Sequence, residues 1–393
     1  MPRAVRLLQG ALMAATRLES TNEGATTLAP VKHRARFHTL TVAEVRPLTA
    51  DSVEVTFTVP PKLQGAFDYL PGQHLALRAT IDGQELRRSY SICRPEAFGQ
   101  ISVAIKRDLG GAFSTWANSE LHAGDELDVM SPQGSFTSNL RNLDHKHVVG
   151  VAAGSGITPL MALAHTVLAA SDTSMFTLVY TNRTALDVMF LDELAELKDR
   201  YPARLALYHV LSREQRSSSL LSGRIDEEKF RRMLDTILRP ATVDEWFLCG
   251  PFELVQLCRD TLESTGVDRA HVRFELFTTG EPSAANGDRG RPVIIGTGDR
   301  TFQIEFTLDG QSNTVTTPVN ANESILNAAL RVRPDVPFAC AGGVCGTCRA
   351  KLVSGDVTMT ENYALEPEEL ARGYVLTCQS HPTTDTVVVD YDV

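Results

Sequence analysis

From residue 37 to residue 140, apolar and polar positions alternate in short runs, and glycine or proline separates one run from the next. An alternation with a period of two predicts β-strands that have one buried face. Short strands that follow one another through tight turns favour an antiparallel β-barrel. The runs are 39–45, 52–59, 74–81, 101–107 and 125–130.

The pattern changes at His145, where runs of consecutive apolar residues begin to alternate with helical stretches. Strands of this kind joined by helices indicate a doubly wound parallel sheet. We therefore predict an α/β domain over 145–277. Its expected strands are 147–154, 176–182, 204–212, 245–250 and 271–277, and its expected helices are 158–170, 185–200, 226–237 and 251–266.

Three further segments complete the expected organisation. Residues 278–297 begin with many Gly, Pro, Ser and Thr residues and are expected to be a linker. Residues 298–393 are expected to form a small α+β domain that begins with a hairpin around Asp309-Gly310. Residues 1–36 are expected to be a disordered extension, with a later start at Met13 or a transit-type peptide as alternatives. They contain no signal-peptide core, so we expect a cytoplasmic location.

Composition and charge narrow the class of protein. The chain is 43% hydrophobic and 22% charged, as in ordinary globular proteins, and its formal charge is −10. That charge argues against a nucleic acid as partner, because binding to phosphates needs a basic face. Residues 298–393 contain 13 acidic and 6 basic residues, a net of −7, which leaves −3 for the rest. No stretch of about 18 apolar residues predicts a membrane span.

Four of the seven cysteines form a pattern near the end of the chain. Cys340, Cys345 and Cys348 follow the spacing C-x4-C-x2-C, and Cys378 lies thirty residues further on. This is the ligand spacing of a plant-type [2Fe–2S] cluster, whereas zinc sites, the alternative, usually contain two C-x2-C pairs or histidines. Glycines between the ligands allow backbone N–H groups to point at the sulfurs. These glycines are Gly342, Gly343 and Gly346, and the other cysteines, apart from Cys249, are expected to be small core residues (Cys93 and Cys258).

Two segments of the predicted barrel have the residue types that a flavin needs. Arg88-Ser89-Tyr90-Ser91 offers a cation for its phosphates, an aromatic ring for its isoalloxazine face and a donor near its reactive nitrogen. About twenty residues later, Gly111-Ala112-Phe113-Ser114 precedes an expected helix at 114–121, where a pyrophosphate can bind. We add Ile105 and Lys106, at the end of the strand between these segments, as cofactor contacts.

The α/β domain contains two glycine turns that suit a nicotinamide dinucleotide. The turn that includes Gly154, Gly156 and Thr158 follows the first parallel strand and opens a helix, where a pyrophosphate can bind with Thr158 as hydroxyl donor. It is not the G-x-G-x-x-G pattern, so an ordinary dinucleotide fold is not indicated. Cys249-Gly250-Pro251 ends a later strand. The Cys249 thiol is expected either near the nicotinamide or as a buried small residue.

Basic and hydroxyl residues follow the second and third parallel strands. Arg183 comes directly after one strand, and Ser212 and Arg213 come after the next. A guanidinium beside a hydroxyl suits a dianionic 2′-phosphate. We therefore expect NADPH rather than NADH.

The motifs RSYS, GAFS, GSGITP and CGPFE occur in this order and resemble those of the ferredoxin–NADP reductase superfamily. The cysteine pattern at the end narrows the resemblance to reductases fused to a plant-type ferredoxin. Segments such as FHTLTVAEV, LPGQHLALRA and ENYALEPEELARGYVLTCQ resemble the reductase subunits of phenylacetyl-CoA 1,2-epoxidases. The resemblance covers about 37–393.

The resemblance implies a barrel that binds FAD, an α/β domain that binds NADPH and a β-grasp-like ferredoxin domain. Electrons would pass through the cluster to a di-iron oxygenase, the phenylacetyl-CoA epoxidase of aerobic phenylacetate degradation. Matching positions are implied to contact FAD, namely Arg88, Tyr90, Ser91 and 111–114, or NADP, namely Thr158, Ser212, Arg213 and Cys249. Glu275 and Phe277 match positions near the flavin in relatives. Tyr90, Ser91, Cys249 and Glu275 are the expected catalytic residues.

The acceptor remains open at this point. The acidic ferredoxin domain is expected to dock on a basic patch of its partner, in a way that salt weakens. Another acceptor, such as a fatty-acid desaturase, a hybrid-cluster protein or a different oxygenase, is the alternative. An iron–sulfur redox sensor is a third interpretation, although sensing does not need complete flavin and nicotinamide sites.

Overall fold

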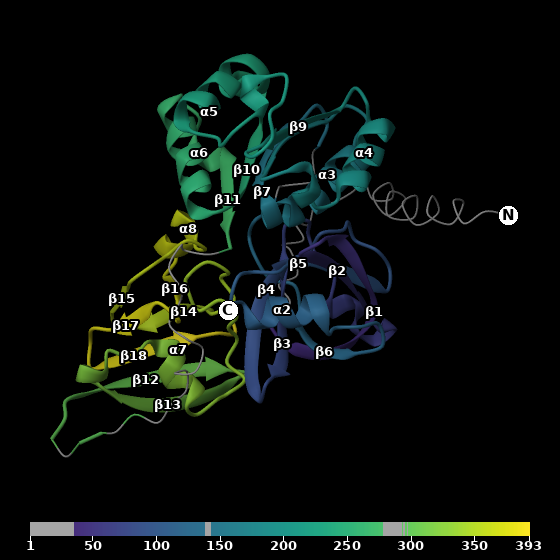
Figure 1. Ribbon diagram of the computed structural model, residues 1–393. Helices are drawn as coiled ribbons and strands as arrows, with labels where there is room; N and C mark the ends of the chain where they lie inside the picture. The colour runs from purple at the N-terminus through teal and green to yellow at the C-terminus, as the bar shows by residue number, and fades with distance from the viewer. Residues whose placement is uncertain (1–34, 138–142, 278–292, 294, 297) are drawn as a thin grey trace, which may run out of the picture.

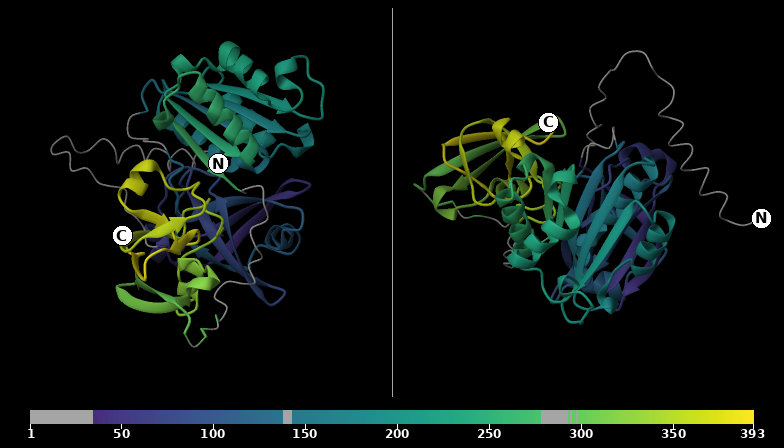
Figure 2. Two further views of the ribbon diagram at one scale, coloured as in Figure 1. Left: turned by 90° about the vertical axis from the view of Figure 1, so that its left-hand side faces the viewer. Right: turned by 90° about the horizontal axis from the view of Figure 1, so that it is seen from above.

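The computed structural model describes residues 35–137, 143–277, 293, 295–296 and 298–393. They form three units, which Figure 1 shows as a barrel, an α/β domain above it and a C-terminal unit at its side. The turned views in Figure 2 show the same three units. The expected linker and N-terminal extension fall almost entirely outside the described residues. No helix in the described part is long and apolar enough to cross a membrane.

The first unit is the predicted antiparallel barrel. Its sheet has the order β4-β3-β6-β1-β2-β5, and a bridge between Ile92 and Val103 brings the end of β4 to β5. Inward-facing residues of alternating strands, such as Val55, Phe57 and Leu75, are buried in one core. The strands are β1 Phe37–Thr49, β2 Ser52–Thr58, β3 His74–Ile81, β4 Gln84–Ser91, β5 Gln100–Lys106 and β6 Glu126–Met130.

One helix, α2 (Ala112–Ser119), lies between β5 and β6. It begins two residues before the predicted start at Ser114, because Gly111 already stands at the N-cap and the Thr115 N–H donates to the Gly111 carbonyl. Residues 112–114 therefore form the first turn of the helix instead of a loop before it.

The second unit is the predicted doubly wound domain. Its five strands are all parallel in the order β11-β10-β7-β8-β9. Helices α3 and α4 pack in the hydrophobic core on one face of the sheet, and α5 and α6 pack in the core on the other. The elements are β7 His147–Ala153, α3 Ile157–Ala170, β8 Met175–Asn182, α4 Leu191–Arg200, β9 Leu205–Leu211, α5 Glu227–Met233, β10 Glu245–Gly250, α6 Phe252–Ser264 and β11 Val272–Leu276.

Helix α4 starts at Leu191, so the prediction of a helix from residue 185 was wrong in its first six positions. Thr184 and Asp187 cap a separate 3₁₀ turn at Ala185–Asp187. Phe190 then adopts a left-handed conformation with φ of 58°, which an α-helix cannot contain.

The third unit has a mixed sheet of order β13-β12-β18-β14-β16, in which β12 and β18 are parallel. The predicted hairpin is confirmed at Asp309-Gly310, where both residues have positive φ. A pair of short strands, β15 and β17, lies beside the sheet. The elements are β12 Thr301–Leu308, β13 Gln311–Pro318, α7 Ile325–Leu330, β14 Arg349–Ser354, β15 Val357–Met359, α8 Pro367–Ala371, β16 Tyr374–Leu376, β17 Ser380–Pro382 and β18 Thr386–Asp390.

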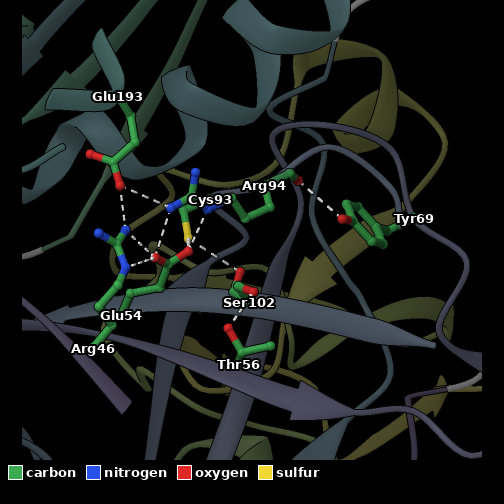
Figure 3. Close-up of polar contacts among 8 residues, drawn as sticks. All are labelled: Arg46, Glu54, Thr56, Tyr69, Cys93, Arg94, Ser102 and Glu193. Atoms are coloured by element: carbon green, nitrogen blue, oxygen red, sulfur yellow. Dashed lines mark hydrogen bonds and ion pairs between the residues drawn. The ribbon is translucent and has the colours of Figure 1, made fainter. Parts of the chain in front are cut away.

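An ion cluster around the buried Glu54 joins the barrel to the α/β domain (Figure 3). Glu54 of the barrel, 4% exposed, accepts hydrogen bonds from Arg46 Nη2 at 2.6 Å and Arg94 Nη2 at 2.7 Å. Both arginines also contact Glu193 of helix α4. Burial favours the neutral acid, but the hydrogen bonds and charges of Arg94 and Arg46 outweigh it and lower the pKa of Glu54. The four ions therefore tie the barrel to helix α4 of the α/β domain.

Candidate functional site

The three units meet at Glu275, near the end of β11. Ser91, the last residue of β4 in the barrel, donates a hydrogen bond from Oγ to Glu275 Oε2 at 2.9 Å. Cys249 stands beside Glu275 on the neighbouring strand β10, and its Sγ lies 4.0 Å from the same carboxylate oxygen. Three of the four predicted catalytic residues are thus together, at the carboxyl edge of the parallel sheet where ligands bind in such folds.

Burial shifts the protonation of these groups. It raises the pKa of Glu275 to about 8, the Ser91 hydrogen bond lowers it in part, and the nearby Cys345 raises it. Burial and then the charge of Glu275 raise the pKa of Cys249 well above its usual range. At neutral pH the site therefore contains a neutral thiol and a largely protonated carboxyl group.

The remaining residues of the RSYS segment line the same end of β4. The Tyr90 ring lies 5.8 Å from that of Phe113 in helix α2, so these two predicted cofactor contacts are neighbours. Ser89 Oγ is buried and has no hydrogen-bond partner among the described residues. A buried hydroxyl without a partner is costly, so this position suits a polar atom of a bound cofactor. Arg88 is half-buried and donates from Nη1 to the Arg87 carbonyl at 2.7 Å.

The turn before helix α2 requires its glycine. A Cβ at Gly111 would lie 2.6 Å from Ser114 Oγ, which donates to the Gly111 carbonyl and accepts from the Asp108 N–H. No side chain caps the N-terminus of the helix, so its first N–H groups suit an anion such as a pyrophosphate. The Ser114 hydroxyl itself is committed to the turn.

Ile105 and Lys106 occupy the end of β5 beside this helix. Ile105 is fully buried in the barrel core, and its carbonyl accepts from Asn118 of α2. Lys106 Nζ is paired with Asp51 at 2.6 Å. Both residues have partners within the barrel, and their predicted cofactor contacts stay predictions.

The two glycine turns of the α/β domain touch each other. Gly154–Gly156 forms a 3₁₀ turn between β7 and α3, and a Cβ on Gly156 would lie 2.1 Å from the Cys249 carbonyl oxygen. Only glycine allows this approach, which brings the helix N-terminus to the Cys249-Gly250-Pro251 turn. Thr158 is buried, and its hydroxyl donates to the Ser155 carbonyl at 3.0 Å, so it closes the turn.

The predicted 2′-phosphate residues are also brought together. The Arg213 N–H donates to the Arg183 carbonyl at 2.8 Å, and the Ser212 N–H donates to the Asn182 carbonyl at 2.9 Å. Both arginine side chains are exposed at the same edge of the sheet. Phe277, after β11, packs half-buried against the core of the α/β domain.

The four cysteines of the C-x4-C-x2-C…C pattern form two contacting pairs. Cys340 is in hydrogen-bonding contact with Cys345, and Cys348 with Cys378. The N–H groups of Gly342 and Cys345 each donate to Cys340 Sγ at 3.4 Å. Of the three glycines predicted to point an N–H group at a sulfur, Gly342 is therefore the one with such a bond among the described contacts. In the described ranges, no three Cys, His or acidic side chains form a group that could hold a single metal ion. Two thiol pairs suit two irons better than one zinc ion.

Family models match all three units. An oxidoreductase FAD-binding domain matches residues 39–138, an oxidoreductase NAD-binding domain matches 151–260, and a 2Fe-2S iron-sulfur cluster binding domain matches 306–383. Among curated proteins, the chain is 44% identical over 357 residues to a subunit of the 1,2-phenylacetyl-CoA epoxidase from Escherichia coli K12, covering 91% of this chain and 98% of that one.

The chain belongs to the family of this epoxidase subunit. A more distant relative is the ferredoxin reductase component of 3-ketosteroid-9-alpha-monooxygenase from Rhodococcus rhodochrous, which is 32% identical and covers 93% of this chain and 100% of that one. The predicted family, fold class and cofactor-binding domains are confirmed.

Solved structures share the fold of this family member. Phthalate dioxygenase reductase, described as modular for electron transfer from pyridine nucleotides to [2Fe-2S], matches with a TM-score of 0.56 and 24% identity, over 90% of this chain and 98% of that one. An intact type IV self-sufficient cytochrome P450 monooxygenase matches with a TM-score of 0.64 and 22% identity, over 92% of this chain and 42% of that one. At these identities the likeness concerns the fold.

Sequence reasoning missed two residues of this family member that link its units. His74, the first residue of β3, is buried, and its Nδ1 lies 3.9 Å from Glu275 Oε1. Its Nε2 lies 3.4 Å from the Thr347 hydroxyl, which in turn accepts from the Cys345 thiol at 3.1 Å. A histidine at the start of the alternating run 74–81 was the one signal in the sequence, and it does not say what the ring contacts.

Proposed function

We propose that this protein is a reductase that takes electrons from NADPH and passes them, through FAD and a [2Fe–2S] cluster, to a di-iron oxygenase. One observation carries the proposal. Glu275 contacts Ser91 and Cys249 on one side and His74 on the other, and His74 reaches Thr347 in the cluster loop. Residues predicted to serve the flavin, the nicotinamide and the cluster are therefore linked by a continuous run of side-chain contacts.

The residues at this junction have separable tasks. Arg88 and the N-terminus of α2 would hold the flavin phosphates, and Ser89 Oγ, which lacks a partner among the described residues, would bind a polar atom of the same cofactor. When bound, a flavin accepts two electrons with a hydride and can release them one at a time. Tyr90 would cover its rings, with Phe113 of the barrel core behind it. Ser91 and Cys249 are buried and Glu275 is only slightly exposed, which would help to exclude water from the place where the nicotinamide would approach.

The cofactor preference rests on the basic edge of the sheet. Arg183 and Arg213 are exposed on adjacent segments that their backbones tie together, with Ser212 beside them. Two guanidinium groups and a hydroxyl suit the 2′-phosphate of NADPH. The pyrophosphate would lie at the Gly154–Gly156 turn, opposite Cys249.

The proposed acceptor is the oxygenase component of a phenylacetyl-CoA epoxidase. The support is the family, since a relative at 44% identity is named as a subunit of that enzyme. The net charge of −7 on residues 298–393 provides the acidic surface that would dock on a basic partner.

The test is an anaerobic titration of the purified protein with NADPH or NADH, followed by assay with the epoxidase components. In the titration, the flavin is expected to be reduced before the cluster. In the assay, phenylacetyl-CoA and the oxygenase are expected to stimulate NADPH consumption, and salt is expected to suppress it. Cytochrome c serves as the control acceptor. Cytochrome c reduction without any stimulation by the epoxidase components would contradict this acceptor and favour another oxygenase. Loss of both activities in fully loaded protein would contradict the reductase itself.

A further inference from the structure

Strand β4 contains a buried arginine next to the flavin segment. Arg87 precedes Arg88, and since neighbouring residues on a strand face opposite ways, its side chain points away from that of Arg88. It is 5% exposed. Burying a guanidinium is costly unless hydrogen bonds replace the lost water, so the contacts of Arg87 define what it does.

Three of these contacts cross into the C-terminal unit. Arg87 Nη2 donates to the Pro334 carbonyl at 3.0 Å, and Nη1 donates to the Val336 carbonyl at 3.3 Å. The guanidinium carbon also lies 4.3 Å from the centre of the Phe338 ring. Its carboxylate partner, Glu85, is half exposed and belongs to the barrel. The charge is therefore shared between Glu85 and the Phe37 ring of the barrel and the loop that leads to the cluster ligands.

This loop lies against the barrel along its length. Cys340 follows Phe338 by two residues. Ala339 packs with Ala76 and Met130 of the barrel in one hydrophobic cluster, to which Cys345 also belongs. Arg87 thus holds the start of the segment in which the first cluster ligand stands, on the same strand that provides Arg88 and Tyr90.

We propose that Arg87 is the positioning residue for electron transfer from the flavin to the cluster: its two hydrogen bonds and its ring contact dock the loop 334–340 on strand β4. This inference rests on the proposed function, but the docking can be measured without electron transfer. Displacement of a reacting group by about 1 Å can reduce a rate by up to about a hundredfold, so a loosened loop has a measurable effect.

A second arginine provides a matched control. Arg36 also joins the barrel to the C-terminal unit, through an ion pair with Asp309 at 2.9 Å, but its side chain is 55% exposed. An exposed pair of this kind contributes little, because water competes for both charges. If every bridge between the two units helped to position the cluster, loss of Arg36 would slow cluster reduction as much as loss of Arg87.

The experiment compares Arg87→Met, Arg87→Lys and Arg36→Met with the wild type as full-length, cofactor-loaded protein. Hydrogen–deuterium exchange of residues 331–340 reports docking in the resting protein. Stopped-flow absorbance with NADPH reports flavin reduction and cluster reduction separately. Flavin, iron and sulfide contents, with the cluster EPR signal, establish equal loading.

For Arg87→Met we expect faster exchange in 331–340 and cluster reduction slowed about tenfold or more, with flavin reduction changed by less than about twofold. Arg87→Lys is expected to lie between, because lysine keeps the charge but loses the planar fork that reaches two carbonyls. Arg36→Met is expected to match the wild type. Wild-type exchange and wild-type cluster reduction in loaded Arg87→Met would overturn the proposal, and so would an equal effect of Arg36→Met.

If Arg87→Met does not retain its cofactors, Phe338→Leu decides the question from the other side of the contact. It removes the ring that faces the guanidinium, so faster exchange and slower cluster reduction support the proposal, and no change in either overturns it. Wild-type protein that reduces its flavin but never its cluster would contradict the proposed function. The exchange of Arg87→Met would still decide whether Arg87 docks the loop.

Discussion

Ser91 and Glu275 are 184 positions apart in the chain and belong to different domains, yet Ser91 Oγ donates a hydrogen bond of 2.9 Å to Glu275 Oε2. Each residue lies at or next to the end of a strand, where a side chain is free to reach beyond its own sheet. The bond therefore marks the place where the barrel and the parallel sheet present their ends to the same space.

Replacement of Glu275 by Gln is expected to change how stability depends on pH. Burial raises the pKa of Glu275 from 4.5 to about 8, so between these values the native carboxyl holds a proton that the unfolded chain releases. Stability of the wild type therefore falls as pH rises through this window, relative to a neutral glutamine. In urea denaturation, the midpoint of Glu275→Gln is expected to rise relative to the wild-type midpoint as the pH is raised from about 6 to about 8.

The exposed Glu253, at the start of α6, provides the control for this measurement. Glu253→Gln is expected to follow the wild type at both pH values. A difference between wild type and Glu275→Gln that stays constant with pH would show that Glu275 does not titrate in this range.

Replacement of Cys348 by Ser is expected to separate the two halves of the reaction. Cys348 is paired with Cys378, so its loss removes one of the proposed iron ligands. The variant is expected to lose the visible absorption of the cluster and to stop reducing the acceptor that takes electrons from the cluster. NADPH is expected still to reduce the flavin, at a rate within about twofold of wild type. Cys258→Ala, a buried change in helix α6, is the control and is expected to keep its cluster. Simultaneous loss of both steps in Cys348→Ser would contradict the modular arrangement.

Replacement of Arg213 by Ala is expected to reduce kcat/KM for NADPH about 10- to 100-fold, the cost of a hydrogen bond to a charged group, and to leave NADH nearly unaffected. Arg232→Ala removes an exposed arginine of helix α5 and is the matched control. The measurement is steady-state reduction of ferricyanide with each nucleotide. Equal losses with the two nucleotides would mean that Arg213 does not bind the 2′-phosphate.

Replacement of Glu54 by Gln is expected to destabilise the protein by about 1.5–3 kcal/mol, because it removes the buried carboxylate and leaves Glu193 as the one acidic partner of Arg46 and Arg94 among the described residues. The pKa of Glu54 is lowered in the fold, so its contribution is present at neutral pH and is lost as pH falls through that lowered value. Thermal denaturation at neutral pH measures the change. Glu227→Gln, which breaks an exposed pair with Arg231 on one helix, is expected to cost less than about 0.5 kcal/mol.

The sequence was informative where the relevant contacts are local. The cysteine spacing predicts a cluster because three of the ligands belong to one loop, and the Asp309-Gly310 turn is determined by its own backbone. The start of helix α4 was placed too early because the acidic and apolar residues from 185 onward have a helical pattern. The capping pair of Thr184 and Asp187 instead closes a separate turn.

Contacts between domains could not be predicted in the same way. The alternating pattern at 74–81 predicts a strand, but the partner of His74 is 273 positions away in another unit. The sequence pattern does not distinguish Arg87 from the other polar residues of the barrel strands. Its burial depends on a loop that comes near only in the folded chain. Sequence patterns report the faces of an element, whereas docking depends on the sum of many surfaces.

The hairpin between β3 and β4 turns at Asp82 and Gly83, both with positive φ, and it pairs His74 with Ser91 at its far end. One added residue at this tip would shift β4 by one place and exchange the sides on which Arg87 and Arg88 emerge. Two exposed residues at the rim of the barrel therefore set which arginine faces the proposed flavin site and which faces the loop 334–340. Natural variants of such enzymes would be expected to keep the length of this turn even where its composition drifts.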